Sequence, residues 1–308
     1  MPSQTPQTSE RYCVVNAKGG VAKTATAANT AAALHERGHN VLAVDADPQG
    51  GLGEITGLTD TYDRDPPTTF DAIVNPRDRD HAGDLVVNRE DTFDVLPSNV
   101  DMLNLERELT LADFAARLHV DGHNDVAALV EDYTIALDTQ QFADGPGHAK
   151  HLLSQTLDAV EEHRDYDYVI VDAPPFYGEI FDACVYAAPD LVVPALPEGS
   201  SQQALDLLVS QLDALEDLTG IVPQERAAVA TRVPAPKTNE ARRMLAWLDE
   251  IVFEDVPVIE VPERVAVQYA SDEGVSVLEY DASDASAAAF REVAAYLDDD
   301  VDATRGET

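Results

Sequence analysis

Residues 12–38, YCVVNAKGGVAKTATAANTAAALHERG, join a strand pattern to a helix pattern through a glycine-containing turn. The apolar run at 12–17 is typical of a buried strand, and the alanine-rich stretch at 23–38 predicts a helix that ends at Gly38. In open α/β sheets, phosphate groups bind at such a junction, because backbone N–H groups and the start of the helix point at the anion. This one segment therefore predicts both a fold class and a binding site.

The alternation of apolar runs and helical patterns continues along the chain. Further strands are predicted at 40–47, 93–98, 166–175, 190–196, 226–233 and 256–261, with helices near 101–118 and 201–217. Near-continuous apolar strands separated by helices indicate a parallel sheet that helices cover on both faces. We therefore predict a doubly wound α/β fold with a mostly parallel sheet.

The same pattern predicts a single domain over residues 11–298. It lies between a flexible N-terminus, 1–10, and an acidic tail, 299–308, that we expect to be disordered. Two regions interrupt the alternation of strands and helices. Residues 57–92 are polar, and residues 119–149 are typical of a helical insertion that ends in a Gly/Pro turn.

The chain is strongly acidic along its whole length. It carries 58 Asp and Glu against 20 Lys and Arg, a net charge of −38, while 44% of its residues are hydrophobic. This balance excludes a disordered chain and is typical of a halophile-type surface, although an acidic mesophilic protein stays open. Near 1 M salt the Debye length is only ~3 Å, so self-repulsion is screened there. At low salt such a surface repels nucleic acid and anionic membranes.

Signals for export, membrane insertion or a metal cluster are weak in this sequence. Cys13 and Cys184 alone provide neither a disulfide framework nor a metal cluster. The first ten residues lack the basic and apolar regions of a secretory signal, and no apolar run approaches the ~18 residues of a membrane span. We therefore expect a cytoplasmic protein.

The turn at 17–25 concentrates half of the lysines in the chain. The lysines are Lys18, Lys23, Lys150 and Lys237. A lysine at a helix start contacts terminal phosphates and the following hydroxyl binds Mg²⁺, so Lys23 and Thr24 fit these two roles. Alanines 17 and 22 replace the two glycines of the standard phosphate loop, but KGGVAKT resembles the deviant Walker A motif of the ParA/MinD family of ATPases.

This resemblance implies a P-loop NTPase of the deviant Walker A type that binds ATP with Mg²⁺. The implied nucleotide-binding residues are Lys18, Gly19, Gly20, Val21, Ala22, Lys23, Thr24 and Ala25. In that family the early lysine reaches across a dimer interface to the partner's nucleotide. The resemblance therefore implies that Lys18 acts catalytically in trans.

Two further motifs place carboxylates at the ends of predicted strands. In VDADPQG, Asp45 and Asp47 point the same way, because strand side chains alternate between two faces. In YVIVDAPP, Asp172 follows four apolar residues, which is the Walker B arrangement. We expect Thr24, Asp45 and Asp172 to hold Mg²⁺, partly through water. The family resemblance implies that Asp47 is catalytic and positions the attacking water.

The resemblance covers residues 10–298, apart from 57–92 and 119–149. It implies an ATP-dependent dimerising switch of chromosome or plasmid partition, in the short form similar to Soj. Such an ATPase forms an ATP-sandwich homodimer and binds nonspecific double-stranded DNA. It hydrolyses ATP slowly and is reset when a ParB-like partner stimulates hydrolysis.

DNA binding needs a basic surface, and one window of the chain is basic. Residues 226–243 hold Arg226, Arg232, Lys237, Arg242 and Arg243 against the single acid Glu240. Lys237 lies in KTN, where relatives carry an arginine implicated in DNA contact. The expected DNA-binding set is therefore Lys237, Arg242, Arg243 and Arg264, and a protein with this activity would associate with the nucleoid.

Other residues of the same region argue against DNA. Glu263 and Ala266 replace two arginines that are frequent in relatives. Arg232 alternatively borders an adenine pocket, and Arg242 and Arg243 alternatively solvate a helix. A protein-positioning or regulatory ATPase that does not bind DNA is therefore an open alternative.

A slow or non-hydrolysing nucleotide-binding regulator is the other alternative. The loop position of Ala22 often takes a left-handed backbone conformation, which costs a residue with a Cβ about 1–2 kcal/mol. Ala25 also replaces a threonine that is usual in the motif. The acidic C-terminus argues against a MinD-type membrane anchor, and the cysteine positions argue against an iron–sulfur relative.

Overall fold

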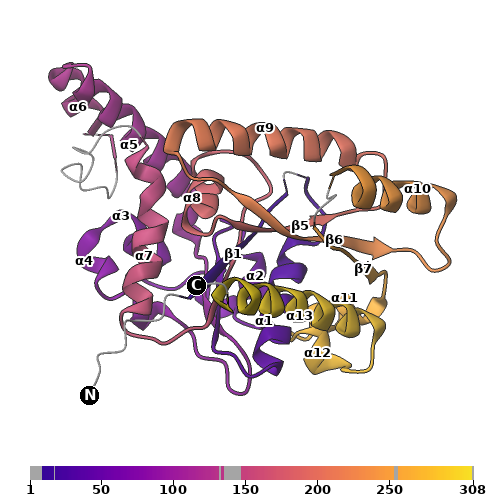
Figure 1. Cartoon of the computed structure of the whole chain (residues 1–308). Helices are drawn as coiled ribbons and strands as arrows, with labels where there is room; N and C mark the ends of the chain where they lie inside the picture. Colours follow the sequence, from indigo (N-terminus) through magenta and orange to yellow (C-terminus); the bar gives the residue numbers. More distant parts are fainter. Residues whose placement is uncertain (1–8, 17, 132, 135–146, 253–255, 307–308) are drawn as a thin grey trace.

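Strands at all seven predicted positions form one parallel sheet in the computed structural model, which describes residues 9–16, 18–131, 133–134, 147–252 and 256–306 (Figure 1). The strands are β1 Glu10–Val14, β2 Val41–Asp45, β3 Asp94–Leu96, β4 Tyr168–Asp172, β5 Asp190–Ala195, β6 Gln224–Val233 and β7 Val258–Pro262. Their order is β3-β2-β4-β1-β5-β6-β7, and every pairing between them is parallel. The doubly wound fold class is confirmed.

Helices of the described residues cover both faces of this sheet (Figure 1). The α-helices of the first half are α1 Lys23–Glu36, α2 Gly51–Ile55, α3 Thr69–Val74, α4 Pro76–Arg79, α5 Leu105–Val120 and α6 Asn124–Glu131. Those of the second half are α7 His151–Glu161, α8 Glu179–Ala187, α9 Ser201–Thr219, α10 Asn239–Trp247, α11 Val265–Asp272, α12 Val277–Tyr280 and α13 Ala285–Gly306. Short helical turns are η1 Thr59–Thr61, η2 Ala82–Leu85, η3 Val100–Asn104, η5 His148–Lys150 and η6 Leu248–Val252.

The core has two parts, one on each face of the sheet. Side chains alternate along β1, so Cys13 packs under α5, α7, α8 and α9, whereas Tyr12 and Val14 pack under α1 and α13. The central strands β1, β2 and β4 are almost completely buried. Because β4 lies between β1 and β2, the carboxyl ends of these three strands meet at one edge of the sheet.

The polar region 57–92 contributes to the core, which its composition did not predict. A capping box formed by Thr68 and Asp71 begins α3. Phe70 and Ile73 of this helix are buried against the face that α7 covers. The region therefore belongs to the folded domain.

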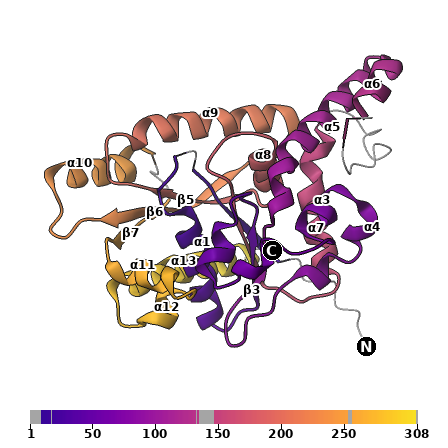
Figure 2. The ribbon, with the colours of Figure 1, turned by 180° about the vertical axis from the view of Figure 1, so that it is seen from behind.

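The described residues of the predicted insertion at 119–149 include the end of α5, the helix α6 and the short helical turn η5. Helix α5 ends at Val120, α6 follows after a turn at 121–123, and both project beyond the end of the sheet in two opposite views (Figures 1 and 2). Residues 132 and 135–146 of this prediction lie outside the described residues. The same holds for residues 1–8 of the predicted flexible N-terminus, whereas β1 begins at Glu10.

The tail at 299–308, which we expected to be disordered, is helical through Gly306. Helix α13 is already formed upstream, where Phe290, Val293 and Leu297 pack in the core beside α1. Extending an existing helix adds a hydrogen bond for each residue that is fixed, so continuation is easier than a new start. No helix among the described residues has both the length and the hydropathy that crossing a membrane requires.

Candidate functional site

The turn between β1 and α1 leaves the start of α1 open to a ligand. Gly20 has φ 77° and Ala22, the N-cap of α1, has φ 65° and ψ 36°, both left-handed. No side chain caps this helix start, so its first N–H groups are free for an anion. Asn16 fixes the entrance of the turn, because its side chain accepts a hydrogen bond from the Lys18 N–H at 2.9 Å and donates to β5. Ala17 lies outside the described residues.

Lys23 begins α1 with its side chain in the cleft described below. The residue is 7% exposed, so its ammonium lies in a largely buried position. Burial lowers the pKa of Lys23, while the carboxylates of Asp172 and Asp47 raise it. A buried ammonium beside open helix N–H groups is a site for phosphate oxygens.

The carboxylates of Asp45 and Asp172 lie at the same edge and are completely buried. One Asp45 oxygen accepts a hydrogen bond from the Gly53 N–H at 3.0 Å. The other Asp45 oxygen and both Asp172 oxygens have no hydrogen-bond partner among the described residues. Burial raises the pKa of Asp172 to about 7, although Thr24 and Lys23 lower it. Burial and the neighbouring Asp172 raise the pKa of Asp45 well above its ordinary value.

These orphaned oxygens fit a hydrated divalent cation. The described part of the chain contains no group of three or more His, Cys, Asp and Glu side chains that could hold a metal directly. Mg²⁺ keeps several waters and is bound by few protein oxygens together with phosphates, so this donor set suits it. Thr24 lies at the same place, because its hydroxyl lowers the pKa of the Asp172 carboxyl.

Asp47 lies two residues beyond Asp45 and faces the same space as Lys23. Its Oδ1 accepts a hydrogen bond from the Gln49 N–H at 2.9 Å, which fixes the carboxylate in the turn after β2. Burial raises the pKa of Asp47, while the Gln49 N–H and Lys23 lower it. The carboxylate therefore lies close to the position that phosphates would occupy.

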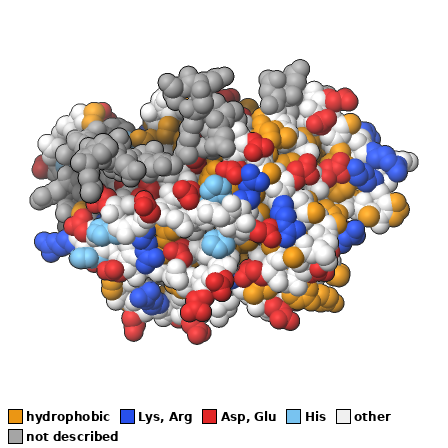
Figure 3. All heavy atoms as spheres, turned by 60° about the horizontal axis from the view of Figure 1, so that its bottom comes forward, with side chains coloured by type: hydrophobic (Ala, Val, Ile, Leu, Met, Phe, Trp, Pro, Cys, Tyr) orange, Lys and Arg blue, Asp and Glu red, His pale blue; other side chains and the backbone are white. Residues whose placement is uncertain are grey.

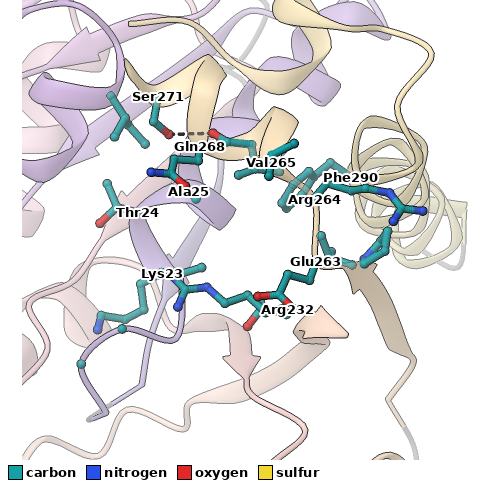
Figure 4. Close-up of a pocket in the computed structure, with 18 of the residues that line it drawn as sticks. Lys23, Thr24, Ala25, Arg232, Glu263, Arg264, Val265, Gln268, Ser271 and Phe290 are labelled. Atoms are coloured by element: carbon teal, nitrogen blue, oxygen red, sulfur yellow. Dashed lines mark hydrogen bonds between the residues drawn. The ribbon is translucent and has the colours of Figure 1, made fainter. Parts of the chain in front are cut away.

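A cleft of about 860 Å³ connects these groups to the far side of the site (Figure 4). One wall is the turn and first residues of α1, with Lys23 and Thr24. The other wall comes from the ends of β6 and β7, from α11 and from α13. Side chains of this second wall include Arg232, Glu263, Arg264, Val265, Gln268, Ser271 and Phe290. Its size is that of a small-molecule site.

Sequence reasoning missed most of this second wall. Arg232 was noted as a possible border of an adenine pocket, and it does line the cleft. Arg232 has φ 53°, and the pairing register between β6 and β7 is irregular at this point. Thr231, which was not noted, donates from its hydroxyl to the carbonyl oxygen of Val21 at 3.0 Å. The signal was the position of both residues near the carboxyl end of β6, where α/β sheets bind ligands.

Lys18 is not among the residues that line the cleft. Its Nζ donates to the Ser200 hydroxyl at 2.6 Å and lies 3.4 Å from a Glu198 oxygen, at the start of α9. The structure therefore brings Lys23, Thr24, Asp45, Asp47 and Asp172 together and directs Lys18 elsewhere on its own chain.

The expected DNA-binding residues differ in their local contacts. Arg264 lines the cleft, Lys237 forms an ion pair with Glu260, and the exposed Arg242 bonds Asn239 of its own helix. Arg243 is exposed on α10. On the face shown in Figure 3, acidic side chains are spread among basic and apolar ones.

A parallel sheet with an uncapped helix start, a buried lysine and orphaned strand-end carboxylates defines a P-loop nucleotide-binding protein. A family model described as AAA domain matches residues 9–139 and 123–221. The chain is 26% identical over 285 residues to the chromosome partitioning protein ParA of Caulobacter vibrioides, covering 91% of each protein. The chain belongs to this AAA domain family, within its ParA/MinD type of ATPases.

Solved structures agree with this assignment at the level of the fold. An ATP complex of a McdA variant from Cyanothece has a TM-score of 0.71 at 20% identity, covering 94% of this chain and 96% of that one. The septum site-determining protein MinD from Pyrococcus horikoshii, complexed with Mg-ADP, has a TM-score of 0.60 at 18% identity over the same shares.

Proposed function

We propose that this protein is a dimerising switch ATPase of the partition type, which binds Mg-ATP in the cleft and is reset by hydrolysis. The observation that carries the proposal is the convergence of Lys23, Thr24, Asp45, Asp47 and Asp172 at the open start of α1. The names of the relatives, ParA and MinD among them, support it.

Each residue has a physical role in this proposal. The N–H groups of residues 19–25 and the Lys23 ammonium hold the phosphates, with the base toward Arg232 and Val265. Thr24 binds Mg²⁺ directly, and Asp45 and Asp172 hold its waters. Mg²⁺ supplies charge neutralisation of the phosphates. Asp47 orients the attacking water for in-line transfer.

Lys18 has a role only in the dimer. In the single chain it is held by Ser200 and Glu198 at the protein surface. We propose that it contacts the nucleotide of a second copy, so that ATP joins two chains. Hydrolysis, slow alone and stimulated by a ParB-like partner, then separates them.

Binding of nonspecific double-stranded DNA by the ATP dimer is part of the proposal, with Lys237, Arg242, Arg243 and Arg264 as the contacts. A dimer carries two copies of the basic window, so it can contact more phosphates than one chain can. A protein-positioning ATPase without DNA binding is the second candidate. The ion pair of Lys237 with Glu260 favours it, because that lysine is already partly neutralised.

Sedimentation in molar KCl with Mg-ATP tests both candidates. Wild type and Lys18→Ala are compared with and without nonspecific duplex DNA, and Lys237→Ala is added for the DNA step. A wild-type dimer that carries DNA, lost in Lys18→Ala, supports the partition function. If the dimer forms but does not bind DNA, the positioning ATPase is supported. If the protein stays monomeric with ATP, the proposed switch is wrong.

A further inference from the structure

Tyr62 lies directly against the turn that carries Asp47. Its hydroxyl donates a hydrogen bond to the carbonyl oxygen of Pro48 at 2.9 Å. Its ring packs on Gly50, where an added Cβ would lie 2.6 Å from a ring carbon. Gly50 also has φ 69°, so both the space and the backbone conformation favour glycine. The aromatic ring and the turn are therefore closely fitted.

The turn itself is short and holds Asp47 by two bonds. The Asp47 Oδ1 accepts from the Gln49 N–H, and the Asp47 carbonyl oxygen accepts from the Gly50 N–H, each at 2.9 Å. Tyr62 contacts the residues on either side of Gln49. A displacement of this turn would therefore move the Asp47 carboxylate with it.

Tyr62 is fixed by contacts outside the turn. Its carbonyl oxygen accepts a hydrogen bond from the Val100 N–H at 2.9 Å, in the segment that follows β3. On the other side of the turn, the Gly53 N–H binds the buried Asp45 carboxylate. The turn is thus held between β2 and a tyrosine that is anchored to η3, the helical turn that follows β3. Tyr62 is not among the residues that line the cleft.

We infer that Tyr62 is a positioning residue for ATP hydrolysis, which clamps the turn 47–50 so that Asp47 can orient water. The inference rests on the proposed ATPase function. Tyr62 is expected to affect ATP hydrolysis and not ATP binding, because the phosphates and the base contact other residues. Loss of the clamp lowers turnover at saturating ATP and leaves the affinity for ATP unchanged.

The test compares wild type, Tyr62→Phe and Tyr62→Ala in molar KCl with Mg²⁺. Tyr62→Phe removes only the hydrogen bond to Pro48, and Tyr62→Ala also removes the ring. We expect kcat to fall about three- to tenfold in Tyr62→Phe, the effect of one neutral hydrogen bond, and further in Tyr62→Ala. KM is expected to stay within about twofold of wild type in both variants. Tyr280→Phe, on the exposed face of α12, is the matched control and keeps wild-type kcat.

Amide hydrogen exchange without nucleotide gives a second readout. Exchange of residues 44–55 rises in both Tyr62 variants and stays unchanged in Tyr280→Phe if the clamp exists. Wild-type kcat and exchange in both Tyr62 variants overturn the inference. A parallel change of KM, kcat and Tm also overturns it, because that is the effect of a packing residue.

Asp47→Ala separates this inference from the proposed function. If wild type turns over ATP no faster than Asp47→Ala, the ATPase proposal fails and the role of Tyr62 falls with it. If Asp47→Ala is inactive and Tyr62→Ala is as active as wild type, the ATPase proposal stands and only the clamp is wrong.

Discussion

Asp45 and Asp172 occupy paired positions at the carboxyl ends of the adjacent parallel strands β2 and β4. Both side chains are completely buried, and three of their four oxygens have no hydrogen-bond partner among the described residues. Burying carboxylates without partners costs free energy in the unliganded fold. A bound cation and its waters offset that cost, so stability of this site is coupled to ligand binding.

Replacing Asp172 by Asn is expected to stabilise the unliganded protein by about 1 kcal/mol, because one of two neighbouring buried carboxylates is removed. The same change should lower Mg²⁺-dependent ATP turnover at least about tenfold, because a holder of the metal's water is lost. Urea unfolding without nucleotide and a steady-state ATPase assay measure the two effects.

Asp190→Asn is the matched control for this substitution. Asp190 begins β5 and accepts a 2.7 Å hydrogen bond from Arg226, so its charge is compensated. Removing the Asp190 charge should lower the stability of the protein slightly and leave ATP turnover unchanged. If Asp172→Asn is less stable than wild type without ligand, the idea that these buried carboxylates destabilise the unliganded protein is wrong.

Ala22→Gly is expected to raise the free energy of unfolding by about 0.5–1 kcal/mol. The left-handed conformation at φ 65° costs a residue with a Cβ about 1–2 kcal/mol, and part of this gain is lost to the greater freedom of glycine in the unfolded chain. Gly20→Ala is the mirror experiment, because Gly20 has φ 77° and open space at its Cβ position. Gly20→Ala should lower the free energy of unfolding by a similar amount. Equal stabilities of wild type, Ala22→Gly and Gly20→Ala would contradict the argument.

The parts of the fold that the sequence predicted are those set by local patterns. The buried strands have near-continuous apolar runs, and the turn before Lys23 has glycine and lysine at fixed offsets. The left-handed conformation expected at Ala22 is also found. These features depend on neighbours within a few residues, which the sequence displays directly.

The parts that were missed depend on contacts between distant segments. Tyr62 lies in a polar stretch, and its fit to Gly50 appears only when the chain folds back over the turn. Phe70 and Ile73 lie within the same polar region, and a short capped helix buries them. Arg232 was named as a possible border of an adenine pocket, but its own left-handed backbone at an irregular strand pairing was not predicted.

Lys150→Met is expected to destabilise the protein by about 3–5 kcal/mol. The lysine is 2% exposed, and its Nζ lies 2.6 Å from Glu179 and 2.9 Å from Asp182 on the first turn of α8. Removing the ammonium leaves two carboxylates facing one another without a cation. Thermal or urea unfolding measures the loss, with Lys237→Met as the control.

Lys237 also forms an ion pair, with Glu260, but both side chains are about 40% exposed. Exposed pairs contribute between 0 and about 1 kcal/mol, so Lys237→Met should change stability little. Equal effects of the two substitutions would show that the burial of Lys150 has no energetic consequence.

Asp298 gives the fold an acid-sensitive contact between α13, α1 and the sheet. Its carboxylate accepts hydrogen bonds from Tyr168 at 2.8 Å and Arg37 at 2.7 Å, and His39 lies 3.1 Å away. Burial raises the pKa of Asp298, but these hydrogen bonds outweigh burial and lower it below its ordinary value of 3.8.

A carboxyl group with a lowered pKa in the folded state stabilises the fold above its unfolded pKa, and this contribution is lost as the pH falls through the folded pKa. Wild type should therefore lose stability below about pH 4, where the unfolded chain takes up the proton first. Asp298→Asn should be less stable at pH 7 and show a flatter decline below pH 4. Unfolding in urea from pH 7 to pH 2.5 measures both, with the exposed Asp206→Asn as the control. If the free energy of unfolding falls with pH in parallel for wild type and both variants, Asp298 does not cause the loss of stability in acid. The pKa of Asp298 would then be the same in the folded and unfolded states.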